Sequence, residues 1–168
     1  ILYRLVGSEM CIRDRGYCVF NDLAICAFLA RDEHGYERIA VLDLDVHQGD
    51  GTATILEGEE GIITISVHGE KNFPFRKAKS DHDFPLPNGT RDEGYLLAVE
   101  ESLAIIEDFS PEILLFQAGV DALEHDALGN LDVSQDGMRI RNDMVFSILD
   151  RRTPCVLFMG GGYSDPIE

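Results

Sequence analysis

The chain has 168 residues, enough for one domain with its own hydrophobic core but too few for two. Hydrophobic residues make up 45% and charged residues 27%, which is typical of folded globular proteins and argues against disorder. The formal net charge of −17 comes from 31 acidic and 14 basic residues. Direct nucleic-acid binding needs clustered Lys and Arg, so this balance disfavours it. An acidic surface attracts cations such as lysine-rich tails or polyamines, or it merely keeps the protein soluble.

The four cysteines, Cys11, Cys18, Cys26 and Cys155, show neither CxxC pairing nor zinc-finger spacing. We therefore expect reduced thiols in a cytoplasmic protein. No stretch approaches the roughly 20 apolar residues of a membrane span, and no signal peptide is recognisable, so we expect no association with a membrane.

Residues 1–15 differ from the rest of the chain. They show no sustained helical or strand period, and the piece VGSEMCIRDR resembles translated adapter sequence. We expect residues 1–15 to be a non-native segment and residues 16–168 to be part of a domain. The alternative is a genuine but unremarkable N-terminal segment.

From Gly16 onward, apolar runs alternate with helical patterns. Residues 22–30 are predicted to form a helix, since Leu23, Ala27 and either Leu29 or Ala30 give an apolar stripe. A buried strand is predicted at 39–42, a short helix at 51–57 and a second strand at 61–67. Residues 68–91 are polar and rich in Pro and Gly, which predicts a long functional loop.

The second half of the chain repeats this alternation. Asp92 is predicted to cap a helix that ends before Pro111, and residues 112–118 to form the third strand. Ser134 is predicted to cap a helix with Ile140, Met144 and Ile148 on its packed face. The segment PCVLFMGGGY predicts a fourth strand that runs into a glycine turn.

Strands that alternate with helices predict an α/β fold with a mostly parallel sheet and helices on both faces. The chain stops just past a strand and a glycine-rich turn, where a parallel sheet rarely ends. We therefore expect the domain to be incomplete.

Chemically active residues follow the predicted strands. In parallel sheets, ligand sites form beyond the carboxyl ends of the strands. The residues in these places are Asp43, Asp45, His47, Ser66, His68, Asp121 and Tyr163.

Asp45, His47 and Asp121 make a plausible metal site with one nitrogen and two oxygen donors. Catalytic zinc usually has three protein ligands and one open position for water. In the pattern D-x-H, both side chains point to the same side of an extended segment. Asp43, two residues earlier, would lie behind the ligands and support them. The alternative is a set of ordinary loop carboxylates with a surface histidine.

The motifs occur in an ordered series, LDLDVHQGDGT, SVHGEKNFPF, QAGVDALEHDALGNL and GGGY, preceded by GYCVFND. This series resembles the histone deacetylase family over nearly all of residues 16–168, and HGEKNFPFRKAKSD is most similar to the class IV branch and its bacterial relatives. The implied fold is the arginase/deacetylase-like α/β fold.

The resemblance also implies a role for each matching residue. Asp45, His47 and Asp121 correspond to the zinc ligands, and Tyr163 to the catalytic tyrosine that hydrogen-bonds the developing oxyanion. Tyr17 and Phe73 correspond to the aromatic pair of the acyl-lysine channel, although the family more often has Phe where Tyr17 stands. The positions that hold a structural potassium ion (K+) in relatives are Asp43, Asp45, His47 and Ser66. Asp126 is interpreted as structural.

One departure concerns the general base. The family has a His-His pair about ten residues before the GYC motif, where this chain has GSEMCI. His34, His82 and His125 lie in the wrong segments to replace it. Either the natural N-terminal segment is missing, which we favour, or the protein is a degenerate copy.

The implied reaction is zinc (Zn2+)-dependent hydrolysis of an amide that removes an acetyl or acyl group from lysine or a similar amine. Without the histidine pair, we expect this chain itself to be inactive. Two alternatives remain open: a non-catalytic metal-binding remnant and an arginase-like metallohydrolase. The sequence predicts neither the acyl group nor the oligomeric state.

Overall fold

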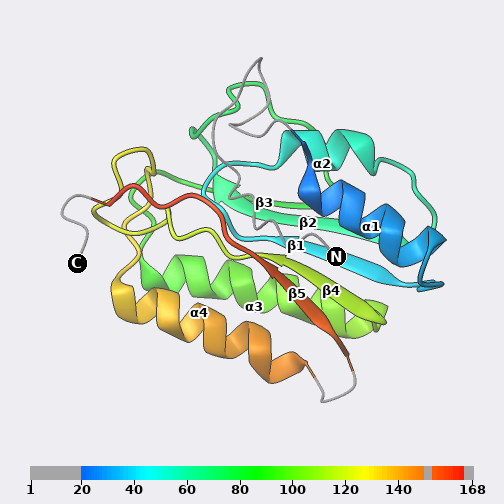
Figure 1. Ribbon diagram of the computed structural model, residues 1–168. Coiled ribbons are helices and arrows are strands. Elements are labelled where there is room, and N and C mark those ends of the chain that lie inside the picture. The colour runs from blue at the N-terminus through cyan, green and yellow to red at the C-terminus, as the bar shows by residue number, and fades with distance from the viewer. Residues whose placement is uncertain (1–19, 150–152, 165–168) are drawn as a thin grey trace.

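The computed structural model describes residues 20–149 and 153–164, which form a five-stranded sheet with helices on both faces (Figure 1). The strand order is β3-β2-β1-β4-β5, and all four pairings are parallel. The predicted α/β class and parallel sheet are therefore confirmed. In chain order the elements are α1 (Asp22–Asp32), β1 (Ile39–Asp43), α2 (Asp50–Ile55), β2 (Ile62–Gly69), β3 (His82–Leu86), α3 (Asp92–Phe109), β4 (Ile113–Gln117), α4 (Gln135–Ile148) and β5 (Cys155–Phe158).

Strand β1 is the central strand, and all five of its residues are buried. Ile39 and Val41 pack in one apolar cluster with α1, whereas Ala40 and Leu42 pack in a second cluster with α3 and α4. This division follows from the alternation of side chains along a strand. Figure 1 shows the result, with α1 and α2 on one side of the sheet and α3 and α4 on the other. Burial on both faces explains the uninterrupted apolar run in the sequence.

Two helix starts test the capping predictions. Ser134 accepts a hydrogen bond from Gly137 N at the start of α4, as predicted. The prediction for Asp92 was wrong, because Arg91 occupies the cap position of α3 and makes no side-chain capping bond. Asp92 instead accepts hydrogen bonds from the Ser134 amide at 2.7 Å and the Ser134 hydroxyl at 2.6 Å. Its carboxylate thus joins the first turns of the two helices.

The predicted loop at 68–91 contains a strand. Residues of β3 pair with β2 in parallel, from Ile65↔His82 to Gly69↔Leu86. The strand contains Pro85, which cannot donate a backbone hydrogen bond and is tolerated because β3 lies at the sheet edge. A strand with proline and a polar alternating pattern gives little local signal, so the prediction of an uninterrupted loop was wrong.

The packed face of α4 differs from the predicted one. Its buried residues include Met138, Arg141 and Val145, whereas Ile140 is 42% exposed. Met144 and Ile148 do pack partly against the core. A charged residue therefore lies on the inward face, which an apolar periodicity cannot predict.

Other expectations concern membranes and thiols. Within the described residues, no helix combines the length and apolar character needed to cross a membrane. Cys26 and Cys155 are free and half-buried. The expectation for residues 1–15 lies outside the described residues, as do Tyr17 and the cysteines at 11 and 18.

Candidate metal centre

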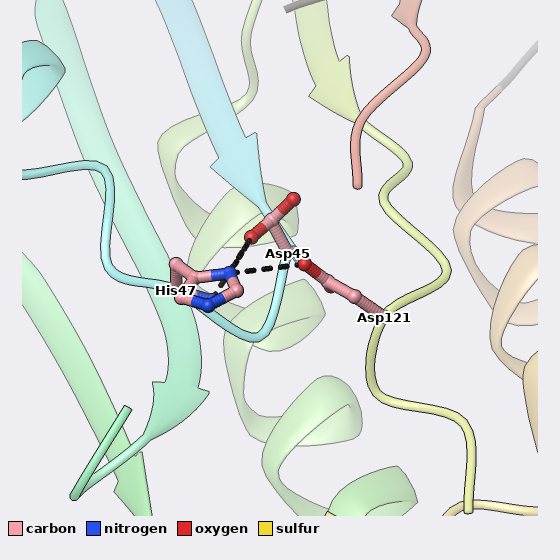
Figure 2. Close-up of side chains that lie close together, drawn as sticks. All are labelled: Asp45, His47 and Asp121. Carbon is pink, nitrogen blue, oxygen red and sulfur yellow. Dashed lines mark hydrogen bonds and ion pairs between the residues drawn. The ribbon is translucent and has the colours of Figure 1, made fainter. Parts of the chain in front are cut away.

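Asp45, His47 and Asp121 converge at the carboxyl edge of the sheet (Figure 2). The first two follow β1 and the third follows β4, and these strands are neighbours. The His47 Nδ1 atom lies 3.1 Å from Asp45 Oδ1 and 3.0 Å from Asp121 Oδ2. One ligand atom from each residue lies within 4.8 Å of the other two. The side chains thus face one another, as a shared metal ion requires.

Backbone amides hold the carboxylates in place. Val46 N donates to Asp121 Oδ1 at 2.8 Å, and His47 N donates to Asp45 Oδ1 at 2.9 Å. Asp45 N donates in turn to Asp43 Oδ1 at 3.1 Å, so Asp43 supports the segment that carries the ligands. These fixed donors pre-orient the oxygen atoms before any ion binds.

The glycine turn after β5 lies directly against the ligands. Gly161 N donates to Asp45 Oδ2 at 3.1 Å, and Gly161 O accepts from Val120 N at 2.7 Å. A Cβ at Gly161 would collide with the Asp121 carboxylate, and one at Gly119 would collide with that of Asp45. Glycine is therefore required at both positions by close approach.

The charges of the cluster perturb one another. Burial alone would lower the pKa of His47, but its hydrogen bonds to Asp121 and Asp45 outweigh burial and raise the pKa to about 10. Burial and then the Asp45 charge raise the pKa of Asp121 to about 7, and the same causes raise the pKa of Asp43 well above its ordinary value. Burial also acts to raise the pKa of Asp45, yet the hydrogen bond from His47 lowers it. Three clustered carboxylates beside one imidazole favour a bound cation.

The donor set suits a divalent metal ion with mixed nitrogen and oxygen ligands. Zinc accepts both imidazole nitrogen and carboxylate oxygen as ligands, whereas calcium and magnesium prefer oxygen alone. Asp121 is fully buried, whereas Asp45 and His47 are partly exposed, which leaves the site accessible from one side. The three residues therefore form a possible metal-binding triad.

A second group of polar residues lies beside the triad. Asp43 and Ser66 are register partners in the β1–β2 pairing, and both are buried. The Ser66 hydroxyl lies 3.0 Å from His68 Nδ1. Burial, followed by the positive charge of Lys77, lowers the pKa of His68 to about 4. The structure thus places Asp43 and Ser66 together, while the potassium site stays a prediction.

The remaining predicted site residues lie around this edge. Tyr163 is 37% exposed, and its amide donates to Asp126 Oδ2 at 2.6 Å. Asp126 Oδ1 also accepts from Leu128 N and Gly129 N, so one carboxylate joins the loop after Asp121 to the segment that carries Tyr163. Its interpretation as a structural residue fits these contacts. Sequence reasoning did not identify this connection, since the two residues are 37 positions apart.

Phe73 lies in the loop between β2 and β3 and is half-buried. Its ring packs edge-to-face against Phe75, with 6.0 Å between ring centroids, and Phe75 is 89% exposed. Asn72 anchors this loop, because its side-chain amide donates to Leu128 O at 2.9 Å. The role of Phe73 in a substrate channel stays a prediction.

Comparison with known proteins agrees with the motif series. Residues 10–167 match the protein-family model that describes the histone deacetylase domain. An uncharacterized protein of Picosynechococcus sp. is 39% identical, over 91% of this chain and 52% of that protein. The histone deacetylase-like amidohydrolase of Pseudomonas aeruginosa is 30% identical, over 92% of this chain and 45% of that protein.

Solved structures show the same architecture. The acetylpolyamine aminohydrolase from Burkholderia pseudomallei superposes with a TM-score of 0.78 and 25% identity, over 88% of this chain and 46% of that one. A histone deacetylase homologue from Aquifex aeolicus gives a TM-score of 0.77 and 28% identity, over 94% and 45% of the two chains. The present chain spans about half the length of these relatives. By its motifs, its fold and the extent of the family match, this chain belongs to the histone deacetylase family.

Proposed function

We propose that this chain carries the metal centre of a zinc-dependent hydrolase that removes acetyl or other acyl groups from lysine side chains or similar amines. The observation that carries the proposal is the convergence of Asp45, His47 and Asp121 on one point at the sheet edge. Family membership supports the reaction class. The names of relatives, a histone deacetylase-like amidohydrolase and an acetylpolyamine aminohydrolase, support an acylated amine as substrate.

The triad would hold the zinc ion through His47 Nδ1 and one oxygen atom of each aspartate. When bound, zinc supplies a Lewis acid that polarises the acyl carbonyl and lowers the pKa of a water molecule. The protein's own contribution is orientation. Amides of Val46, His47 and Gly161 fix the carboxylates, so little reorganisation accompanies the reaction.

Tyr163 is proposed to donate a hydrogen bond from its hydroxyl to the acyl carbonyl oxygen, where negative charge develops in the transition state. Loss of one such donor typically lowers kcat by about 10²–10³-fold. Asp126 would hold the tyrosine backbone near the metal centre through the 2.6 Å contact. Tyr17 and Phe73 are proposed to line the channel for the acyl-lysine stem, and Asp43 with Ser66 to help hold a structural potassium ion.

The general base is the part that the chain does not supply. Its five histidines are at positions 34, 47, 68, 82 and 125, and none precedes Gly16. A general base contributes about 10²–10⁴-fold, so the 168-residue chain should show little or no turnover of an acetyl-lysine fluorogenic peptide even with zinc bound. Turnover that disappears in His47→Ala would depend on the metal centre, and it would refute this assignment by showing that some other group accepts the proton.

A non-catalytic metal-binding protein is the second candidate, and the absence of the histidine pair favours it. An arginase-like dinuclear site would need further clustered ligands. Among the described residues, the triad is the one group of His, Cys, Asp and Glu side chains with metal-ligand spacing. A mononuclear centre therefore fits better.

Zinc binding by the purified chain tests the proposal. We expect one equivalent to bind, measured by competition with a chromophoric chelator. His47→Ala should weaken binding by about 100-fold or more, because loss of a supporting residue alone costs about 10–100-fold. The matched control is His34→Ala, which alters an exposed histidine in the connection between α1 and β1 and should bind zinc normally. Equal affinities for His47→Ala and the unmodified chain would refute the site.

A further inference from the structure

Arg141 is a buried charge in an unusual place. It lies on α4, and its side chain is the largest of the fully buried side chains among the described residues. Among the described ion pairs, no carboxylate pairs with its guanidinium. Burying an ion costs several kcal/mol unless its hydrogen bonds are satisfied, so the contacts of this group need an explanation.

The guanidinium binds backbone carbonyls at the end of β4. Nη1 donates to Gly119 O at 2.6 Å, and Nη2 lies 3.5 Å from Ala118 O. Nε and Nη2 donate to the side chain of Asn142 at 3.1 and 2.9 Å. The charge also lies over the Phe116 ring, 5.8 Å from its centroid. The planar guanidinium thus divides its hydrogen bonds between the strand end that leads to the metal centre and Asn142 on its own helix.

These carbonyls belong to the segment that carries a proposed ligand. Gly119 comes two residues before Asp121, and a Cβ at Gly119 would collide with the Asp45 carboxylate. The backbone amides on either side of Gly119 are also hydrogen-bonded: Ala118 N donates to Phe158 O, and Val120 N donates to Gly161 O. The position of this short segment therefore affects both aspartates.

A second, longer path reaches the other ligand segment. Arg141 Nη1 lies 3.5 Å from the Tyr95 hydroxyl, which lies 3.5 Å from Leu44 O. Leu44 stands between Asp43 and Asp45, and Tyr95 is fully buried. Arg141 thus contacts the backbone after β4 directly and that after β1 through a buried phenol.

We propose that Arg141 is a positioning residue for the metal centre: its guanidinium fixes the strand-end carbonyls of Ala118 and Gly119 so that Asp121 and Asp45 face His47. This inference rests on the proposed metal site. Arg141 touches neither the ion nor the substrate and acts through Gly119 and Tyr95. Other residues that hold metal ligands in place alter metal affinity about 10–100-fold when they are replaced.

The test uses three variants of the full chain and two measurements at the metal. Arg141→Met removes charge and donors, and Arg141→Lys keeps the charge but loses the planar fork. Arg139→Met is the matched control, because Arg139 lies on the same helix with its side chain 72% exposed and pairs only with Asp136 among the described ion pairs. Zinc affinity is measured by chelator competition, and cobalt(II) absorption reports the coordination geometry.

We expect Arg141→Met to weaken zinc binding by about 10–100-fold and to change the cobalt(II) spectrum, with Arg141→Lys intermediate and Arg139→Met within about twofold of the unmodified chain. Urea unfolding without metal separates this effect from stability. Unchanged zinc affinity and cobalt spectrum in Arg141→Met would overturn the proposal. So would unfolding of both Arg141 variants without urea, which would make Arg141 a folding residue. Absence of zinc binding by the unmodified chain would overturn the metal site itself, and the role of Arg141 with it.

Discussion

Metal affinity should depend steeply on pH, because protons and the metal ion compete for the same atoms. Burial acts to lower the pKa of His47, but its two aspartate partners outweigh burial and raise the pKa to about 10. Burial and the charge of Asp45 raise the pKa of Asp121 to about 7. A metal ion binds the deprotonated forms of both groups. Affinity must therefore fall as pH decreases through these values.

The size of the effect follows from the number of protons released. Between pH 8 and pH 6, His47 stays protonated in the free protein. Zinc binding must therefore release its proton, which lowers the zinc affinity about tenfold per pH unit, or about 100-fold over this range. Asp121, with a pKa of about 7, contributes about a further tenfold over the same range. Zinc affinity should thus fall by about 1,000-fold from pH 8 to pH 6.

The assay is chelator competition at several pH values, corrected for protonation of the chelator. In His47→Ala, the remaining zinc binding should show a slope lower by about one proton, whereas His34→Ala should keep the full slope. An affinity that is constant between pH 6 and pH 8 would refute the reasoning, since the ligands would then carry no protons to displace.

Three further predictions concern the surroundings of the centre. Gly161→Ala should weaken zinc binding by about tenfold, since its Cβ would collide with Asp121; unchanged affinity would contradict the close approach. Asp126→Ala should destabilise the chain to urea by about 1–2 kcal/mol and speed hydrogen exchange at the Tyr163 amide, which loses its 2.6 Å acceptor; equal exchange would contradict it. Burial lowers the pKa of His68 in the folded state to about 4. Between about pH 6.5 and pH 4, the unfolded chain therefore protonates this histidine and the folded chain does not. Stability should therefore fall from about pH 6.5 toward pH 4, and His68→Asn should reduce this loss in urea titrations at the two pH values.

The central sheet and the triad were predictable because their signals are local. Each of β1 and β4 is a short apolar run, and the proposed ligands follow within a few residues. Parallel strands bring their carboxyl ends to one edge, so position along the chain was enough to place Asp45, His47 and Asp121 together.

The features that were missed depend on contacts between distant segments. Asp92 lies where a helix cap is expected, yet its carboxylate is used by Ser134, 42 residues away. The inward side of α4 was assigned from apolar spacing, whereas a buried arginine satisfied by strand-end carbonyls occupies it. Strand β3 has Pro85 within it and forms only because β2 offers an edge. Local periodicity contains no information about such partners.

The most direct test of the metal centre is the zinc K-edge X-ray absorption spectrum of the one-to-one complex. The account predicts a coordination shell of nitrogen and oxygen at about 2.0–2.2 Å, with the outer-shell scattering of a single imidazole that disappears in His47→Ala. A sulfur ligand at about 2.3 Å, or scattering from several imidazoles, would place the ion elsewhere and contradict the assignment of Asp45, His47 and Asp121.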